Sequence, residues 1–215
     1  MSARRADGLA SPPRPCKPGR YKAHLYNMLD ALLFARMFLK YPSMLGSVWP
    51  SSDYLCKRLM RQIDWRTART VVEFGPGVGT ITRHILRNLH PDGTLVAIEK
   101  NPELVDTLSA KLAAHDHRLK LLEGSAADVR NILDDFGLAT ADCIVSGIPF
   151  SLIPADEGHR IMEGIRESLA PSGKLLIYQF SGAIEPLLRQ HFQTVRSGYE
   201  LRNFLPARTY LASNL

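Results

Sequence analysis

A glycine-rich turn preceded by an acidic residue is the feature of this sequence that points most directly to chemistry. Residues 71–80 read V-V-E-F-G-P-G-V-G-T, an apolar run followed by three glycines at intervals of two residues. Glycine allows the backbone to approach a ligand where any Cβ atom would collide. The spacing differs from the G-x-G-x-x-G of dinucleotide-binding turns, and the anionic Glu73 would oppose a pyrophosphate. Glu73 instead favours a ligand that carries an amino group and a sulfonium cation.

In composition and spacing, this segment resembles motif I of the class I methyltransferases. The resemblance implies that S-adenosyl-L-methionine is the cofactor. A turn that merely connects a strand to a helix is the alternative, and the acid, the glycine spacing and the preceding apolar run together argue against it. The residues of this segment that are expected to bind the cofactor are Glu73, Gly75, Pro76, Gly77, Gly79 and Thr80.

A second acidic residue is expected to complete the ribose site. Glu99 ends an apolar run 22 residues after Gly77, and Lys100 follows it. A carboxylate at the end of the second strand accepts hydrogen bonds from both hydroxyls of a ribose. We therefore predict that Glu99 and Lys100 belong to the cofactor site.

The segment L-E-G-S-A-A-D at 122–128 is the third element of the predicted cofactor site. In the resembling family an acidic residue usually follows the glycine and meets the adenine amino group, whereas this chain has Ser125. We predict that Ser125 and Ala126 line the adenine position through side chain or backbone. Asp128 is the alternative ligand, although an acid there is also typical of a helix cap.

The acceptor site is predicted at residues 146–150, S-G-I-P-F, after the fourth expected strand. Methylation of an amine requires its lone pair to point at the methyl carbon, and backbone carbonyls with a small polar side chain hold its N–H groups in that orientation. An aromatic ring stabilises the cation that forms on nitrogen. Enzymes that methylate amino groups of nucleic acids have a related N-x-P-Y segment. We predict that the catalytic residues are Ser146, which also contacts the cofactor, Gly147, Ile148, Pro149 and Phe150.

Short apolar runs alternate with helical patterns from residue 70 onward. This alternation predicts an α/β domain whose sheet is mostly parallel and covered by helices on both faces. With motif I, it predicts the class I methyltransferase Rossmann-like fold with a seven-stranded sheet. The expected strands are 70–74, 94–98, 119–122, 143–146, 174–180 and an antiparallel pair at 192–196 and 208–212, and the expected helices are 81–89, 102–115, 127–136, 157–169 and 184–189.

The net charge of +6 is concentrated at the N-terminal end. Residues 1–40 hold eight basic and two acidic side chains, so the remainder of the chain is neutral. Residues 1–20 are basic and rich in proline, as in a disordered extension. Residues 21–44 are predicted to form an amphipathic helix that lies in a membrane interface, because they combine apolar, basic and aromatic side chains. A helix packed on its own sheet is the alternative. The methyltransferase domain is predicted over 45–215.

Composition and motif spacing argue against a secreted, a membrane-spanning or a metal-binding protein. The first 20 residues contain no apolar run of a secretory signal. The most apolar stretch, 28–39, is interrupted by Asp30 and Arg36 and is too short to span a bilayer. The three cysteines are far apart and fit no metal-binding spacing, so no metal is expected. Unpaired thiols suit a reducing cytoplasm.

Four segments narrow the resemblance: L-G-S-V-W-P-S-S at 45–52, E-F-G-P-G-V-G-T at 73–80, S-G-I-P-F at 146–150 and N-F-L-P-A-R at 203–208. Over about residues 21–212 the chain resembles the bacterial phospholipid N-methyltransferases. These enzymes are peripheral to the membrane and convert phosphatidylethanolamine toward phosphatidylcholine. The resemblance implies N-methylation of the ethanolamine headgroup of an aminophospholipid. It also implies a cytoplasmic protein, monomeric in solution, that binds the anionic inner face of the membrane.

Residues for substrate binding are less clearly marked. Tyr21, Tyr26, Arg202 and Arg208 are predicted to bind the lipid, the arginines through paired donors to its phosphate. A surface arginine without a ligand is the alternative for each. No residue stands out as the general base, and Tyr21, Tyr26, Tyr41 and His159 are the contributors suggested by residue type.

Two other functions stay open. The ribosomal RNA adenine dimethyltransferases are related by motif, but they carry asparagine where this chain has Ser146 and have an additional helical domain. RNA adenine N6-methylation is therefore an alternative, and RNA is not the expected partner. A module that binds S-adenosyl-L-methionine without catalysis is the other, and the acceptor segment at 146–150 argues against it.

Overall fold

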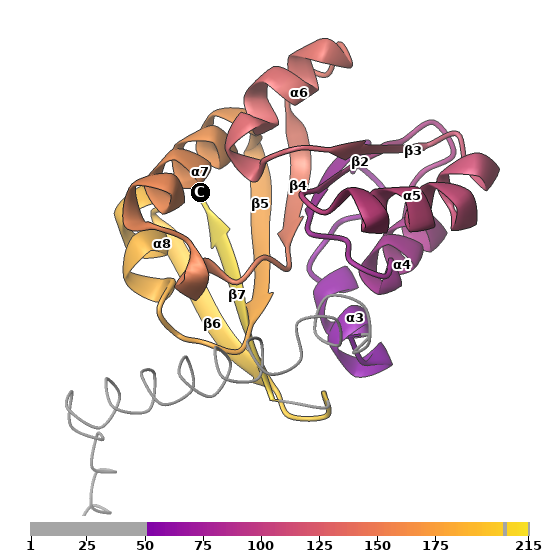
Figure 1. Ribbon diagram of the computed structural model, residues 1–215. Coiled ribbons are helices and arrows are strands. Elements are labelled where there is room, and N and C mark those ends of the chain that lie inside the picture. Colours follow the sequence, from indigo (N-terminus) through magenta and orange to yellow (C-terminus); the bar gives the residue numbers. More distant parts are fainter. Residues whose placement is uncertain (1–50, 204–205, 215) are drawn as a thin grey trace, which may run out of the picture.

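The computed structural model describes residues 51–203 and 206–214, which form one seven-stranded sheet between two layers of helices (Figure 1). The strand order is β3-β2-β1-β4-β5-β7-β6, in which β7 is antiparallel to both neighbours and every other pair is parallel. This confirms the predicted fold class. The strands are β1 (Thr70–Phe74), β2 (Thr94–Glu99), β3 (Leu119–Glu123), β4 (Ala141–Ser146), β5 (Leu169–Gln179), β6 (Thr194–Glu200) and β7 (Ala207–Ser213).

The helices are divided between the two faces of the sheet. Buried residues of α3 and α4 pack on one face, with α5 beside α4, and those of α6, α7 and α8 pack on the other. The helices are α3 (Asp53–Met60), α4 (Thr80–Asn88), α5 (Pro102–Lys111), α6 (Val129–Asp135), α7 (Ala155–Ser168) and α8 (Glu185–His191). The predicted extension at 1–20 and amphipathic helix at 21–44 lie outside the described residues.

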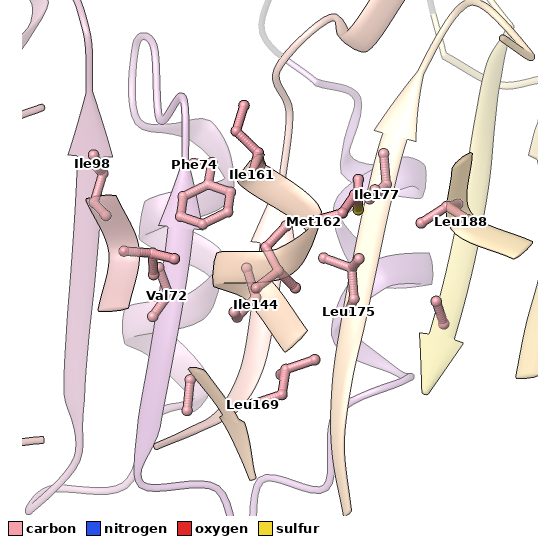
Figure 2. Packing of buried hydrophobic residues seen from close by; sticks show 14 of the residues in the cluster. Val72, Phe74, Ile98, Ile144, Ile161, Met162, Leu169, Leu175, Ile177 and Leu188 are labelled. Atoms are coloured by element: carbon pink, nitrogen blue, oxygen red, sulfur yellow. The ribbon is translucent and has the colours of Figure 1, made fainter. Parts of the chain in front are cut away.

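The two faces of the sheet bury separate hydrophobic clusters. Along β1, Val72 and Phe74 belong to the cluster under α6, α7 and α8, whereas Val71 belongs to the cluster under α3 and α4. Figure 2 shows the first cluster, with Ile144 of β4 and Ile161 of α7 packed beside them. Successive side chains of a strand point to opposite faces, so strands covered on both faces are apolar throughout. This explains the continuous apolar runs in the sequence.

All of the strands and helices predicted from residue 70 onward are present, although β6 is shifted to Thr194–Glu200 and α5 ends at Lys111 rather than at 115. Two larger features differ. Helix α3 was not predicted; it begins after Ser52, whose hydroxyl accepts a hydrogen bond from the Leu55 N–H. Strand β5 begins at Leu169 rather than at 174 and includes the Pro-Ser-Gly sequence that is typical of a turn. The pairing of β4 with β5 shifts register between Ala141 and Cys143, which accommodates that sequence.

The order of the strands places the functional segments at one edge of the sheet. Strands β1, β2, β3, β4 and β5 all run in one direction, so their carboxyl ends meet at what we term the carboxyl edge. Figure 1 shows β4 and β5 running downward toward this edge. The chain leaves β1 and β4 in opposite directions across the sheet, and ligands of open α/β sheets bind at such a switch point. None of the helices within the described ranges has the length and apolar character needed to cross a membrane.

Candidate functional site

The glycine turn lies at the switch point, between β1 and α4. Gly75, Gly77 and Gly79 have φ angles of 67°, 57° and 81°. Residues other than glycine rarely adopt positive φ angles, so the backbone conformation of this turn requires glycine at these three positions. The Gly79 N–H donates to the Pro76 carbonyl at 2.9 Å and closes the turn, and α4 begins at Thr80. The free N–H groups of the first helical turn therefore face the carboxyl edge.

Glu99 lies at the end of β2 and is joined to the glycine turn. Its Oε2 accepts a hydrogen bond from the Gly77 N–H at 3.1 Å. Its Oε1 accepts from the Lys100 and Asn101 N–H groups at 2.9 and 3.1 Å. These three bonds hold the buried carboxylate beside the middle glycine. The structure thus brings together the two segments predicted to bind the cofactor, and the contact of Glu99 with a ribose stays a prediction.

Glu73 is buried in β1, and within the described part of the chain neither oxygen of its carboxyl group has a hydrogen-bond partner. Burial raises the pKa of Glu73 to about 8, and the negative charge of Glu99 adds to this rise. The polar groups of Thr82 lie near the carboxyl group and oppose the rise, although they do not reach hydrogen-bond geometry. An unpaired buried acid is unfavourable unless a partner neutralises it. A cation bound at this edge would supply that partner.

Ser125 and Ala126 follow β3, beside the end of β2. The Gly124 N–H donates to the Glu99 carbonyl at 2.9 Å, which joins the two strand ends. The Ser125 hydroxyl accepts a hydrogen bond from the Ala127 N–H at 3.2 Å and so caps a short 3-10 helix, Ala126–Asp128. Asp128 is the residue before α6, without a side-chain hydrogen bond to that helix. The predicted adenine position therefore adjoins Glu99, and the adenine contact itself stays a prediction.

The acceptor segment after β4 is joined directly to the glycine turn. The Gly147 N–H donates to the Phe74 carbonyl, the last of β1, at 3.0 Å. A Cβ atom on Gly75 would lie 3.0 Å from Cγ2 of Ile148, so Ile148 packs against the turn. Ser146 is buried, and its hydroxyl has no hydrogen-bond partner among the described residues. The structure thus places a polar group between the predicted acceptor and cofactor sites.

Phe150 begins the 3-10 helix Phe150–Leu152 that follows Pro149. Its ring is buried in the cluster that contains Phe74 and Ile161. This packing gives Phe150 a structural role, and its effect on a cation at the acceptor nitrogen stays a prediction.

Tyr178 is a site residue that was not predicted from the sequence. It lies near the end of β5, and a Cβ atom on Gly147 would collide with its hydroxyl and ring. Gly147 is therefore required because the Tyr178 ring covers it. Burial raises the pKa of Tyr178, the charges of Glu73 and Glu99 add to this, and a hydrogen bond with Ser51 opposes it. A tyrosine at the carboxyl end of an aliphatic strand was the available signal.

The family-specific segments at 45–52 and 203–208 meet at the same edge. The Ser52 N–H donates to Oδ1 of Asn203 at 2.8 Å, although the two residues are 151 positions apart. Thus the end of one segment contacts the start of the other. Residues 45–50 lie outside the described part of the chain.

The predicted lipid-binding arginines also lie at the carboxyl edge. Arg202 pairs with Glu200 at 3.1 Å and stacks on Tyr54, with 4.2 Å from its Cζ atom to the ring centre. Arg208 stacks on Tyr199, with a distance of 4.8 Å. Both guanidinium groups are thus held by aromatic rings, and their contact with a phosphate stays a prediction.

The remaining predicted residues are separate from this group or outside the description. The Lys100 ammonium lies 3.8 Å from the Glu157 carboxylate of α7. His159 is hydrogen-bonded to His191 of α8 at 3.1 Å. Tyr21, Tyr26 and Tyr41 lie outside the described residues. Within those residues, no group of three or more His, Cys, Asp or Glu side chains could hold a metal ion.

Comparison with known proteins agrees with this geometry. A family described as methyltransferase domain matches residues 71–173. The ornithine lipid N-methyltransferase of Singulisphaera acidiphila is 33% identical over 184 residues, which cover 85% of this chain and 95% of that protein. The chain belongs to the bacterial lipid N-methyltransferase family, of class I. It is therefore an S-adenosylmethionine-dependent N-methyltransferase.

Two further similarities are more general. The ribosomal RNA small subunit methyltransferase A of Parasynechococcus marenigrum is 30% identical over 107 residues, but the chain spans only 34% of that protein. The crystal structure of the O-methyltransferase TomG from Streptomyces achromogenes, in complex with SAM, has a TM-score of 0.62 and 17% identity. That comparison covers 90% of this chain and 96% of TomG, and it shows a shared fold.

The residues at the carboxyl edge fit the cofactor of this N-methyltransferase family. The unpaired carboxyl group of Glu73 suits the cationic part of S-adenosyl-L-methionine. The turn at Gly75, Gly77 and Gly79 leaves room for a ligand against the backbone. The carboxylate of Glu99, held by backbone N–H groups, suits a ribose. Charge and shape thus agree with the predicted cofactor.

Proposed function

We propose that this enzyme methylates the amino group of a membrane lipid headgroup, with phosphatidylethanolamine as the substrate that is converted toward phosphatidylcholine. The observation that carries the proposal is the junction of the acceptor segment with the glycine turn, through Gly147 and Phe74 and through Gly75 and Ile148. The name of the ornithine lipid N-methyltransferase supports a lipid acceptor.

The site residues would orient an amine. S-adenosyl-L-methionine, when bound, supplies a methyl group that its sulfonium cation already activates. The unpaired Ser146 hydroxyl and the nearby backbone carbonyls would accept hydrogen bonds from the amine and aim its lone pair. A tyrosine hydroxyl is protonated at neutral pH, and burial raises the pKa of Tyr178 further, so that it is a poor general base. Tyr178 therefore serves to orient the acceptor rather than to remove its proton.

An ornithine lipid is the second candidate substrate, and the relative from Singulisphaera acidiphila favours it. Both lipids present a primary amine and an anionic group, a phosphate in one and a carboxylate in the other. Arg202 and Arg208 lie at the edge where either anion would bind. The two substrates differ mainly in the distance between amine and anion.

The test is methyl transfer from radiolabelled S-adenosyl-L-methionine to three acceptors: phosphatidylethanolamine, an ornithine lipid and structured ribosomal RNA. Both lipids are presented in detergent so that membrane binding does not limit the rate. We expect label in phosphatidylethanolamine and none with Gly77→Val, whose side chain would fill the cofactor turn. Label in the ornithine lipid alone would show that the substrate is an ornithine lipid, while the proposed methylation of a lipid amino group would still hold. Label in RNA alone would contradict the proposal and favour adenine methylation.

We further propose that the enzyme is peripheral at the cytoplasmic face of the membrane, with residues 21–44 as an interfacial helix. The positive charge of residues 1–40 supports this proposal because anionic lipids attract basic segments.

A further inference from the structure

The exposed apolar side chains of the described residues are unevenly distributed. Five large ones are exposed: Tyr54 at 50%, Phe136 at 42%, Leu152 at 42%, Tyr199 at 50% and Leu201 at 71%. Phe136 follows α6 and lies at the amino-terminal edge of the sheet, because α6 runs back from the carboxyl edge. The other four lie at the carboxyl edge. Single exposed apolar residues are ordinary, but a group on one edge indicates an interaction surface.

The topology explains why these four residues share the edge. Leu152 ends the 3-10 helix that follows the acceptor segment. Strand β7 is antiparallel to β5, with Arg208 opposite Gln179, so the connection from β6 to β7 lies beyond the carboxyl end of β5. Figure 1 shows this connection on the same side as α3. Tyr199 is the last but one residue of β6, Leu201 begins the connection, and the Ser52–Asn203 bond holds the start of α3 beside it.

Cations accompany the apolar side chains. Arg202 stacks on Tyr54, and its side chain is 66% exposed although it pairs with Glu200. Arg208 stacks on Tyr199. Tyrosine rings with an apolar body and a polar tip, beside arginines, are typical of a membrane–water interface. An edge that combines exposed apolar side chains with two arginines is complementary to anionic headgroups above acyl chains.

We propose that this edge, formed by Tyr54, Leu152, Tyr199, Leu201, Arg202 and Arg208, rests on the surface of an anionic phospholipid bilayer. The inference rests on the proposed lipid substrate in one respect: this orientation turns the acceptor segment at 146–150 toward the headgroups. The amine then reaches Ser146 while the acyl chains stay in the bilayer. The edge is a contact surface of the catalytic domain itself, in addition to any contact that residues 21–44 make.

A matched pair of variants tests the docking edge. Leu201→Asp removes an apolar side chain and adds a charge that anionic lipids repel, and Phe136→Asp makes the same change at the opposite edge. Both are made in the full chain and measured by co-sedimentation with vesicles of phosphatidylglycerol and phosphatidylcholine. We expect about tenfold weaker binding for Leu201→Asp and wild-type binding for Phe136→Asp. If Leu201→Asp fails to fold by circular dichroism, Leu201→Ser replaces it.

The outcomes separate this inference from the proposed function. Equal vesicle binding of Leu201→Asp and the wild type would overturn the docking edge, and so would equal losses in both variants. Methylation of a detergent-dispersed aminolipid is the separate readout, and Leu201→Asp should retain it within about twofold because no bilayer is involved. If the wild-type enzyme methylates no dispersed lipid, the proposed function fails, while the vesicle comparison still decides the edge. Hydrogen exchange adds a direct map: vesicles should protect residues 199–203 and leave 134–138 unchanged.

Discussion

Among the site residues, Glu73 is the one whose position is least favourable for the stability of the folded protein. Its carboxyl group is buried without a hydrogen-bond partner in the described structure, and its pKa rises from 4.5 to about 8. The folded protein therefore holds a proton that the unfolded chain releases. The stability that comes from this bound proton is fully present below pH 4.5 and is lost as the pH rises from 4.5 through 8.

We predict that Glu73→Gln removes this pH dependence. Without cofactor, the variant should match the wild type near pH 5 and melt at a higher temperature than the wild type at pH 8.5, because the amide does not ionise. Its affinity for S-adenosyl-L-methionine should fall, since the neutral side chain no longer attracts a cation. Thermal unfolding over this pH range and calorimetry check both effects. Parallel stability curves for the two proteins would contradict the prediction.

A second residue-scale prediction concerns Glu99. Its carboxylate accepts hydrogen bonds from the Gly77, Lys100 and Asn101 N–H groups. Glu99→Ala should weaken cofactor binding by roughly 10- to 100-fold, because a hydrogen bond to a charged group contributes about 1.5–3 kcal/mol. Calorimetry provides the measurement. Glu123→Ala is the control, since Glu123 pairs in register with Glu99 on β3 but is exposed. Equal losses in both variants would count against a specific contact.

Phe150 requires a variant that preserves the core. An alanine there would remove a buried ring at a cost of about 3–5 kcal/mol, so the effect on catalysis would be confused with unfolding. Phe150→Leu retains most of the packing and removes the aromatic face. We expect normal cofactor affinity and a turnover about tenfold lower, from the loss of one cation–π contact. Unchanged turnover would leave Phe150 with its structural role alone.

At the scale of elements, the bond between Ser52 and Asn203 joins α3 to the β6–β7 connection. Asn203→Ala should lower the free energy of unfolding by about 1 kcal/mol and increase hydrogen exchange at 51–54, because the helix start loses its anchor. Asn88→Ala is the matched control, since its amide bonds to His84 within α4. Exchange at 51–54 that stays at the wild-type rate would show that other contacts hold the helix.

At the scale of the whole molecule, the net positive charge lies in a different part of the sequence from the methyltransferase domain. Residues 1–40 carry the entire net charge of +6, and the rest of the chain, which contains the sheet, is neutral. This basic segment, residues 1–40, which we term the arm, should recruit the enzyme to anionic membranes, with about 1 kcal/mol gained for each cation near the surface.

We therefore predict that removal of residues 1–40 abolishes most vesicle binding and most methylation of lipid in bilayers. Methylation of a short-chain or detergent-dispersed aminolipid should fall less, unless the arm also closes the active site. Co-sedimentation with vesicles rich in phosphatidylglycerol or cardiolipin checks the first effect, and salt should weaken binding without abolishing it. A gel shift with structured RNA is the parallel measurement. Tight RNA binding without vesicle binding would favour the adenine methylase alternative.

The sequence by itself determined the strands and helices from residue 70 onward and the position of the cofactor turn. Alternating apolar runs and helical patterns indicate which residues are buried. The glycine spacing indicates a local backbone conformation, which the structure shows as φ angles of 57–81°. Both signals are local. They failed where local signals conflict with pairing, as in the Pro-Ser-Gly sequence within β5, and at α3, which begins with a cap at Ser52 beside the distant Asn203.

Only the tertiary structure decided which of these segments meet. The register of β1 with β4 brings Gly147 to Phe74, and the packing of β5 places Tyr178 over Gly147. The antiparallel return of β7 places Arg202 and Arg208 at the carboxyl edge. The burial that raises the pKa of Glu73 likewise depends on the elements packed around β1. Such contacts join residues up to 151 positions apart, so they follow from strand order and register, which no local pattern of side chains records.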